Sequence, residues 1–129
     1  MRKITYFGLV GLMAATGCGA AAAATTDWMT RGNLETYAMT SKSKQWYPTR
    51  IECKQGQGGP LLRLTTKPIV DGNKPFHKWN WVFGEAADLT SLVLKLKRSD
   101  RLDLKYRIVS KSTYKGADGI SYGCAVAYR

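Results

Sequence analysis

The sequence predicts an α+β domain in which two helix–strand–strand repeats form one antiparallel sheet, with both helices packed on one face of that sheet. The first observation is a pair of similar predicted strands, one beginning near Tyr47 and the other near Tyr106, 59 residues later. Each is followed by a glycine-containing turn and a second apolar strand. Helical apolar spacing precedes each pair of strands. Each repeat also holds one cysteine, Cys53 or Cys124. A period of this size is typical of repeated supersecondary units.

Each repeat begins with a predicted helix. In the first repeat, residues 33–84, Asn33 is expected to cap a helix that ends near Gln45. In the second, residues 85–129, the segment from Asp88 to Arg101 has helical spacing, although its leucines also alternate as in a strand. The repeat favours a helix here, because a helix precedes the strand of the first repeat.

Five strands are expected from alternation or from short apolar runs between turns. They cover residues 46–54, 61–66, 77–83, 105–114 and 120–128. Residues 68–75 form a loop, since Asp71, Gly72 and Asn73 favour a turn. One face of the last strand carries only small side chains, which favours close packing by a helix or loop.

The first 24 residues predict a bacterial export signal. Arg2 and Lys3 provide a charged start, residues 4–15 are apolar, and small residues follow up to Ala24. This pattern is too short for a membrane span with a stop-transfer flank. We therefore expect an exported protein, in the periplasm or outside the cell, whose single domain covers residues 25–129.

Two processing routes remain open at this signal. An Ala-x-Ala site that ends near Ala22 or Ala24 would release a soluble domain. The four residues that end at Cys18 resemble a bacterial lipobox, although Ala15 stands where leucine is favoured. In that second route, Cys18 would carry a lipid that anchors the domain to a membrane.

Cys53 and Cys124 predict one disulfide, because they are the pair that remains in an oxidising compartment once Cys18 is removed or lipidated. The alternative is two buried free thiols. Two distant cysteines and a single histidine are too few ligands for a metal site, so neither a metal nor a cofactor is expected. A domain of about a hundred residues has a modest core, which a disulfide supports.

The charge predicts an anionic partner. The chain has 20 basic and nine acidic residues, a formal charge of +11, and without Arg2 and Lys3 the 18 remaining basic residues still give +9. This balance favours lipid head groups, an envelope polysaccharide or an acidic protein, with nucleic acid less favoured. It argues against an inhibitor of basic enzymes, because like charges slow their encounter.

Short motifs in both repeats have counterparts in a known family. They are Gly84 with the helix after it, the Tyr-Arg-Ile-Val-Ser run at 106–110, Tyr114, Gly119 and the Cys-Ala-Val run at 124–126. These residues resemble the repeats of the bacterial tandem repeat family. Residues 46–51 resemble a degenerate first copy of the repeat, and residues 79–84 resemble the aromatic strand that joins two copies. Lys105 and Ala127 stand where glycine and tryptophan are usual. Because family members often occur beside serine-hydrolase domains, the resemblance implies an accessory or binding role.

The candidate binding residues are basic side chains of the second helix and the strand that follows it. They are Lys95, Lys97, Arg98, Arg101, Lys105, Arg107 and Lys111, of which the last three are expected on the polar side of that strand. The alternative is a solvated face that only keeps the protein soluble.

His77 offers a catalytic alternative, because it could act as a general acid or base with Glu52 or Glu85. It could equally be a strand residue beside Trp79, since no nucleophile elbow or phosphate-binding loop accompanies it. Trp79 and Trp81 share its face and would form either part of the core or a flat platform for sugars or bases.

Together these observations predict an exported, non-catalytic domain that binds an anionic polymer or protein. Two alternatives stay open: a small secreted hydrolase or nuclease-type toxin that uses His77, and an accessory or inhibitor-like partner of an envelope enzyme.

Overall fold

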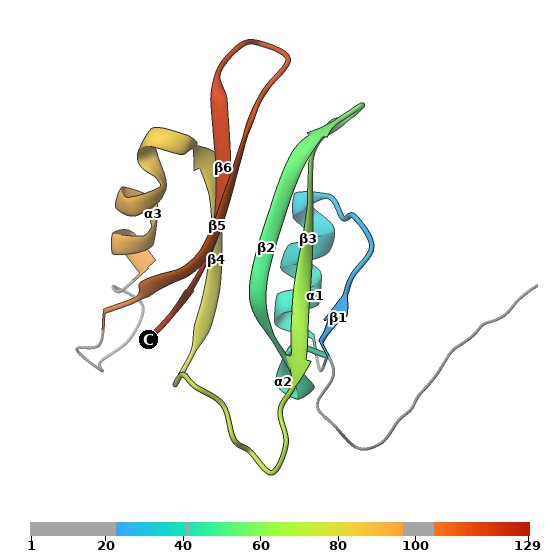
Figure 1. The fold of residues 1–129 in the computed structure, drawn as a ribbon, viewed down its shortest axis with the longest axis vertical. Helices are drawn as coiled ribbons and strands as arrows, with labels where there is room; N and C mark the ends of the chain where they lie inside the picture. Colours follow the sequence, from blue (N-terminus) through green and yellow to red (C-terminus); the bar gives the residue numbers. More distant parts are fainter. Residues whose placement is uncertain (1–22, 41, 97–104) are drawn as a thin grey trace, which may run out of the picture.

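Two three-stranded antiparallel sheets form the domain (Figure 1). The computed structural model describes residues 23–40, 42–96 and 105–129. The first sheet has the order β1 (Ala24–Thr25), β3 (Gly59–Pro68), β2 (Trp46–Gly56), and the second has the order β4 (Trp79–Glu85), β6 (Ser121–Tyr128), β5 (Arg107–Lys115). The α+β class is confirmed, and the prediction of one continuous sheet is wrong. Residues 1–22 of the predicted export signal, including Cys18, lie outside the described residues, whereas Ala24 at its predicted end lies in β1 and pairs with Thr66.

The two sheets meet along β2 and β5, where side-chain contacts join the strands in place of a ladder of backbone hydrogen bonds. The backbone N–H of Ile51 donates to the Ser110 hydroxyl at 3.1 Å. The disulfide between Cys53 and Cys124 is confirmed, with the two Cα atoms 6.3 Å apart. A serine hydroxyl thus satisfies the Ile51 amide, which needs no partner in a backbone ladder between β2 and β5.

An inner core fills the space between the sheets. Alternate residues of β2, β3 and β6 point into it, and α1 (Arg31–Met39) adds Leu34. The buried members are Leu34, Ile51, Cys53, Leu62, Leu64, Cys124, Val126 and Tyr128. Trp79 and Trp81 pack against this inner core and are partly buried, which favours their interpretation as core residues.

A separate outer core lies under α3 (Leu89–Leu96), on the side of the second sheet away from β2 (Figure 1). A 3₁₀ turn, η1 (Ala86–Asp88), leads into this helix, and Leu89 and Val93 pack on Ala125 and Ala127. The helix prediction for Leu89–Leu96 is confirmed, and the small residues of the last strand do allow a helix to pack closely.

The two helices do not share one face, which corrects the prediction. α1 contributes to the inner core and α3 to the outer core. The first helix also begins earlier than expected: Thr30 is its N-cap, and the Thr30 hydroxyl accepts from the N–H of Asn33 at 3.2 Å. A short second helix, α2 (Lys42–Gln45), then leads into β2.

Candidate functional site

The second sheet has two chemically different ends. At one end, Tyr128 of β6 pairs with Trp79 of β4 and Arg107 of β5. At the other end, Tyr122 of β6 pairs with Glu85 and Tyr114. Each end borders a hollow, and the first sheet and its connections complete both of them.

A basic hollow of about 340 Å³ lies at the first end. It is lined by Lys44, Ile69, Lys74, Phe76, His77, Lys78 and Trp79. Backbone hydrogen bonds hold the connection between β3 and β4 against the end of the chain: the N–H groups of His77 and Lys78 donate to the Arg129 carbonyl at 2.6 and 3.2 Å, and the N–H of Arg129 donates to the Lys78 carbonyl at 3.0 Å. These bonds place the basic side chains beside the sheet.

Aromatic rings lie beneath the cations of this end. The Lys74 Nζ lies 5.3 Å from the centre of the Phe76 ring, and the Arg107 Cζ lies 5.8 Å from the centre of the Tyr128 ring. The Phe76 ring lies 4.9 Å from that of Tyr128 and 5.4 Å from that of Tyr47. Cations over aromatic faces are attracted by the ring quadrupole, so these rings help to orient Lys74 and Arg107 without neutralising them.

Tyr128 is buried at the base of this cluster, and its hydroxyl donates to the carbonyl of Pro48. Burial raises the pKa of Tyr128 to about 12, the charge of Tyr47 adds to the increase, and Arg107 opposes it. The phenol is therefore neutral at physiological pH, and the charge of this end comes from the lysine and arginine side chains.

None of the described residues that line the basic hollow is acidic. In the described part of the chain, the ion pairs join Glu52 to Arg63 at 2.6 Å and to Arg50 at 3.4 Å. The hydrogen bond from Arg63 lowers the pKa of Glu52, so this carboxylate is ionised and already engaged. The lysines of the basic hollow thus keep their positive charge available to a ligand.

The structure does not bring the predicted catalytic residues together. His77 is exposed and precedes β4, whereas Glu85 ends that strand. The six residue steps from Trp79 to Glu85 span about 20 Å in an extended strand. Glu52 is paired with Arg63. His77 instead lines the basic hollow among lysines, an environment that can hold an anion.

The predicted binding residues are also divided. Lys95 is exposed on α3 and Lys105 is exposed before β5, while Lys97, Arg98 and Arg101 lie outside the described residues. A register shift between Ile108 and Ser110 leaves one extra residue in β5. Because such a bulge reverses which side chains share a face, Arg107 lies on the face of Tyr128, and Lys111 lies on the opposite face with Ala125. The expectation that both occupy one polar face of the strand is wrong.

Sequence reasoning missed Lys44, Lys74 and Lys78. The composition of residues 68–75 indicates only a turn, and Lys44 belongs to a helix with a weak apolar pattern. The available signal is the run Lys-Pro-Phe-His-Lys at 74–78, where basic residues surround an aromatic ring in a loop. Nothing in the sequence indicates that α2 would bring Lys44 to the same place.

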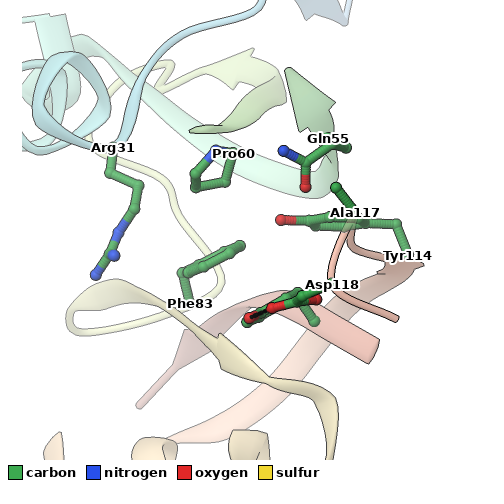
Figure 2. A pocket seen from close by; sticks show the side chains of 8 residues that line it. Arg31, Gln55, Pro60, Phe83, Tyr114, Ala117 and Asp118 are labelled. Atoms are coloured by element: carbon green, nitrogen blue, oxygen red, sulfur yellow. Dashed lines mark hydrogen bonds between the residues drawn. The ribbon is translucent and has the colours of Figure 1, made fainter. Parts of the chain in front are cut away.

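An aromatic hollow of about 390 Å³ lies at the other end (Figure 2). It is lined by Arg31, Gln55, Pro60, Phe83, Tyr114, Ala117, Asp118 and Tyr122. The Phe83 and Tyr122 rings stack with centres 6.0 Å apart and planes 7° apart, and the Tyr114 ring lies 5.9 Å from Tyr122. Arg31 reaches this cluster from α1, with its Cζ 5.0 Å from the centre of the Phe83 ring.

Asp118 is held in place by two hydrogen bonds. It accepts from the Tyr122 hydroxyl at 2.5 Å and from the N–H of Ile120 at 3.0 Å. These bonds lower the pKa of Asp118, and the same hydrogen bond raises the pKa of Tyr122. Gly119, with φ of +84°, allows the tight turn that brings Asp118 back toward β6.

No family model, curated protein or solved structure matches this chain. The resemblance to the bacterial tandem repeat family therefore remains a prediction. Within the described ranges, no helix is long and apolar enough to span a membrane, and no group of three or more His, Cys, Asp or Glu side chains is arranged to hold a metal ion.

Proposed function

We propose that this protein is an exported, non-catalytic domain that binds an anionic polymer at the basic hollow. The observation that carries the proposal is the set of three lysines and one histidine around a hollow with no acidic side chain among its described lining residues. A formal charge of +11 for the whole chain would attract an anion to many surfaces. The hollow adds a defined place where several cations can contact the same ligand.

A polymer fits this end better than a small anion because the cations extend beyond the hollow. Lys74 lies over the Phe76 ring, Phe76 packs on Tyr128, and Arg107 lies over the Tyr128 ring. Phe76 and Trp79 also line the hollow, and such rings can contact the apolar faces of a sugar backbone. A repeating polyanion could contact Lys44, Lys78 and Arg107 at successive charged groups.

The proposed location follows from the disulfide and from the export signal. A disulfide between Cys53 and Cys124 is expected in an oxidising compartment such as the periplasm or the cell exterior. A lipid at Cys18 would add a membrane anchor and would keep the domain near envelope polymers. Mass spectrometry of the mature N-terminus separates a lipidated Cys18 from cleavage near Ala24.

We also infer that the two halves descend from one repeated unit. The hairpins β2–β3 and β5–β6 each carry a register shift near the start of their first strand, at Pro48/Arg50 and at Ile108/Ser110. Ile51 contacts Ser110 across the same 59-residue offset that separates Tyr47 from Tyr106. Structures of relatives test this inference, because both register shifts should be retained together.

The central experiment measures binding to heparin and to lipopolysaccharide at increasing salt. The triple variant Lys44→Ala, Lys74→Ala, Lys78→Ala should bind at least about tenfold more weakly at low salt. Its affinity should also depend less on salt, because fewer charge contacts are lost to screening.

A matched control removes the same charge elsewhere. The variant Lys95→Ala, Lys111→Ala, Lys115→Ala loses three exposed lysines that do not line the basic hollow. It should retain most of the binding. If both triple variants lose affinity equally, the protein binds through its net charge alone, and absence of binding at low salt would contradict the proposal outright.

The two alternative functions predict different results. A hydrolase or toxin that uses His77 should lose activity on RNA, DNA or glycan in His77→Ala. The described residues that line the hollow with His77 include no acidic partner for that role. An accessory or inhibitor-like role predicts that cross-linking in the envelope captures one specific acidic protein. Capture of polymer instead favours the proposal.

A further inference from the structure

The aromatic hollow takes no part in the proposed function, and it is built from both halves of the chain. Phe83, Tyr114 and Tyr122 come from the three strands of the second sheet. Gln55 and Pro60 come from the β2–β3 hairpin, and Arg31 comes from the start of α1. A hollow of this size falls within the range of small-molecule sites, roughly 300–1,000 Å³.

Figure 2 shows how these side chains face one another across the hollow. Gln55 and Pro60 lie on one side, and Phe83 and Asp118 lie on the other. The Tyr114 hydroxyl points into the space between them. The hollow therefore has a flat aromatic wall, an opposing proline ring and polar groups around its rim.

The charges of this hollow are balanced, unlike those of the basic hollow. Arg31 lies at one side and the ionised Asp118 at the other. The Arg31 guanidinium already lies over Phe83, which disfavours a cationic ligand, and the carboxylate of Asp118 disfavours an anionic one. A ligand without net charge suits both groups.

The rim supplies donors and acceptors in fixed places. The Gln55 amide nitrogen donates to the Gly56 carbonyl at 3.0 Å, which orients the amide and leaves its oxygen as an acceptor. Among the described residues the Tyr114 hydroxyl has no hydrogen-bond partner, and it points into the hollow. It can therefore donate to a ligand or accept from it. Arg31 adds planar donors.

We propose that the aromatic hollow binds one neutral pyranose unit of an uncharged oligosaccharide. A pyranose has an apolar C–H face, which would lie on the aromatic wall of Phe83 and Tyr122, beside the Arg31 guanidinium. Its hydroxyl groups lie around the edge of the ring, where Gln55, Tyr114 and Arg31 would hydrogen-bond to them. This site and the polyanion site would let one domain recognise two chemistries of the same cell envelope.

The test is a titration of the disulfide-bonded protein with the uncharged sugars triacetylchitotriose and cellotriose, monitored by backbone amide shifts in NMR. The expected shifts cluster at residues 55–61 and 114–122 and persist at high salt, because no ion pair with the ligand is involved. The double variant Gln55→Ala, Tyr114→Phe should bind about tenfold more weakly, since it removes two hydrogen-bonding groups and keeps every ring.

Gln57→Ala is the matched control, because Gln57 is exposed in the same hairpin turn and does not line the hollow. The dispersion of the backbone amide signals of each free variant shows that its fold is intact. Three results would overturn the proposal: no shifts at millimolar sugar, equal affinity of the double variant and Gln57→Ala, or shifts confined to residues 74–79. The polyanion proposal is unaffected by either of the first two.

Discussion

The two ends of the second sheet are only six residue steps apart along β4, yet they differ in almost every property that governs binding. Among the described residues, the Trp79 end is lined by lysines and no carboxylate, whereas the Glu85 end has one arginine and one aspartate around stacked rings. The net charge of the chain describes neither end. The two proposed sites, one for a polyanion and one for a neutral sugar, would therefore lie one strand length apart.

The difference arises from the connections at the two strand ends. At the basic hollow, a loop with Lys74, His77 and Lys78 returns along the end of the chain. At the aromatic hollow, the tight β5–β6 turn carries Asp118, whose hydrogen bonds to Ile120 and Tyr122 keep the carboxylate beside the rings. The connections therefore set the chemistry of each end, and the sheet sets the separation between the ends.

Removal of the disulfide should have the largest effect and should weaken both ends together, because this bond links the two sheets that form both hollows. Replacing Cys53 and Cys124 by serine opens a loop with a sequence separation of 71 residues. We expect a loss of about 4 kcal/mol in the free energy of unfolding, measured by urea denaturation. Binding at both ends should weaken together. The reduced wild type should match the double variant, and an unchanged urea midpoint would contradict the prediction.

The next effect should leave both ends intact, because it concerns the outer core, which borders neither hollow. A Cβ at Gly123 would lie 2.7 Å from Leu89 Cδ1 and 3.0 Å from the Ser112 carbonyl. We expect Gly123→Val to cost about 3 kcal/mol of stability through overpacking, again measured by urea denaturation. The folded fraction should bind heparin normally. Gly58→Ala is the control, since a Cβ at Gly58 meets nothing within 4 Å.

The smallest expected effect is a loss of stability at high pH that comes from Tyr128, at the end of the sheet with the basic hollow. The folded state keeps Tyr128 neutral up to a pKa of about 12, above the ordinary value for tyrosine of about 10. Its contribution to stability, about 2 kcal/mol, is therefore present below pH 10 and is lost as the pH rises to about 12. Urea midpoints across this range should fall less steeply in Tyr128→Phe than in the wild type. Equal slopes would show that the tyrosines with raised pKa elsewhere, such as Tyr122, account for the loss.

Much of the secondary structure follows from local patterns. The alternation in residues 46–54 and 120–128 predicted β2 and β6 within two residues at each end. The segment Leu89–Leu96 is ambiguous by itself, and comparison with the first half indicates the correct helix. β1 was not predicted, because two residues carry no usable periodicity.

The binding residues were harder to predict. The bulge at β5 separates Arg107 from Lys111, and such a register shift leaves no mark in the alternation of a short strand. The basic hollow joins Lys44 to Lys78 through tertiary packing. The aromatic hollow likewise joins Arg31, Pro60 and Asp118 from distant segments.

Periodicity and the number of cysteines were enough to predict most strands and helices and the pairing of Cys53 with Cys124, because these are local or compositional properties of the chain. Three other outcomes required the folded structure: two sheets form instead of one, the helices occupy different cores, and particular charged residues share an end. They depend on how backbone groups of distant strands are satisfied, as when the Ser110 hydroxyl accepts from the Ile51 amide. Pairings of that kind leave no periodic signal in the amino-acid sequence.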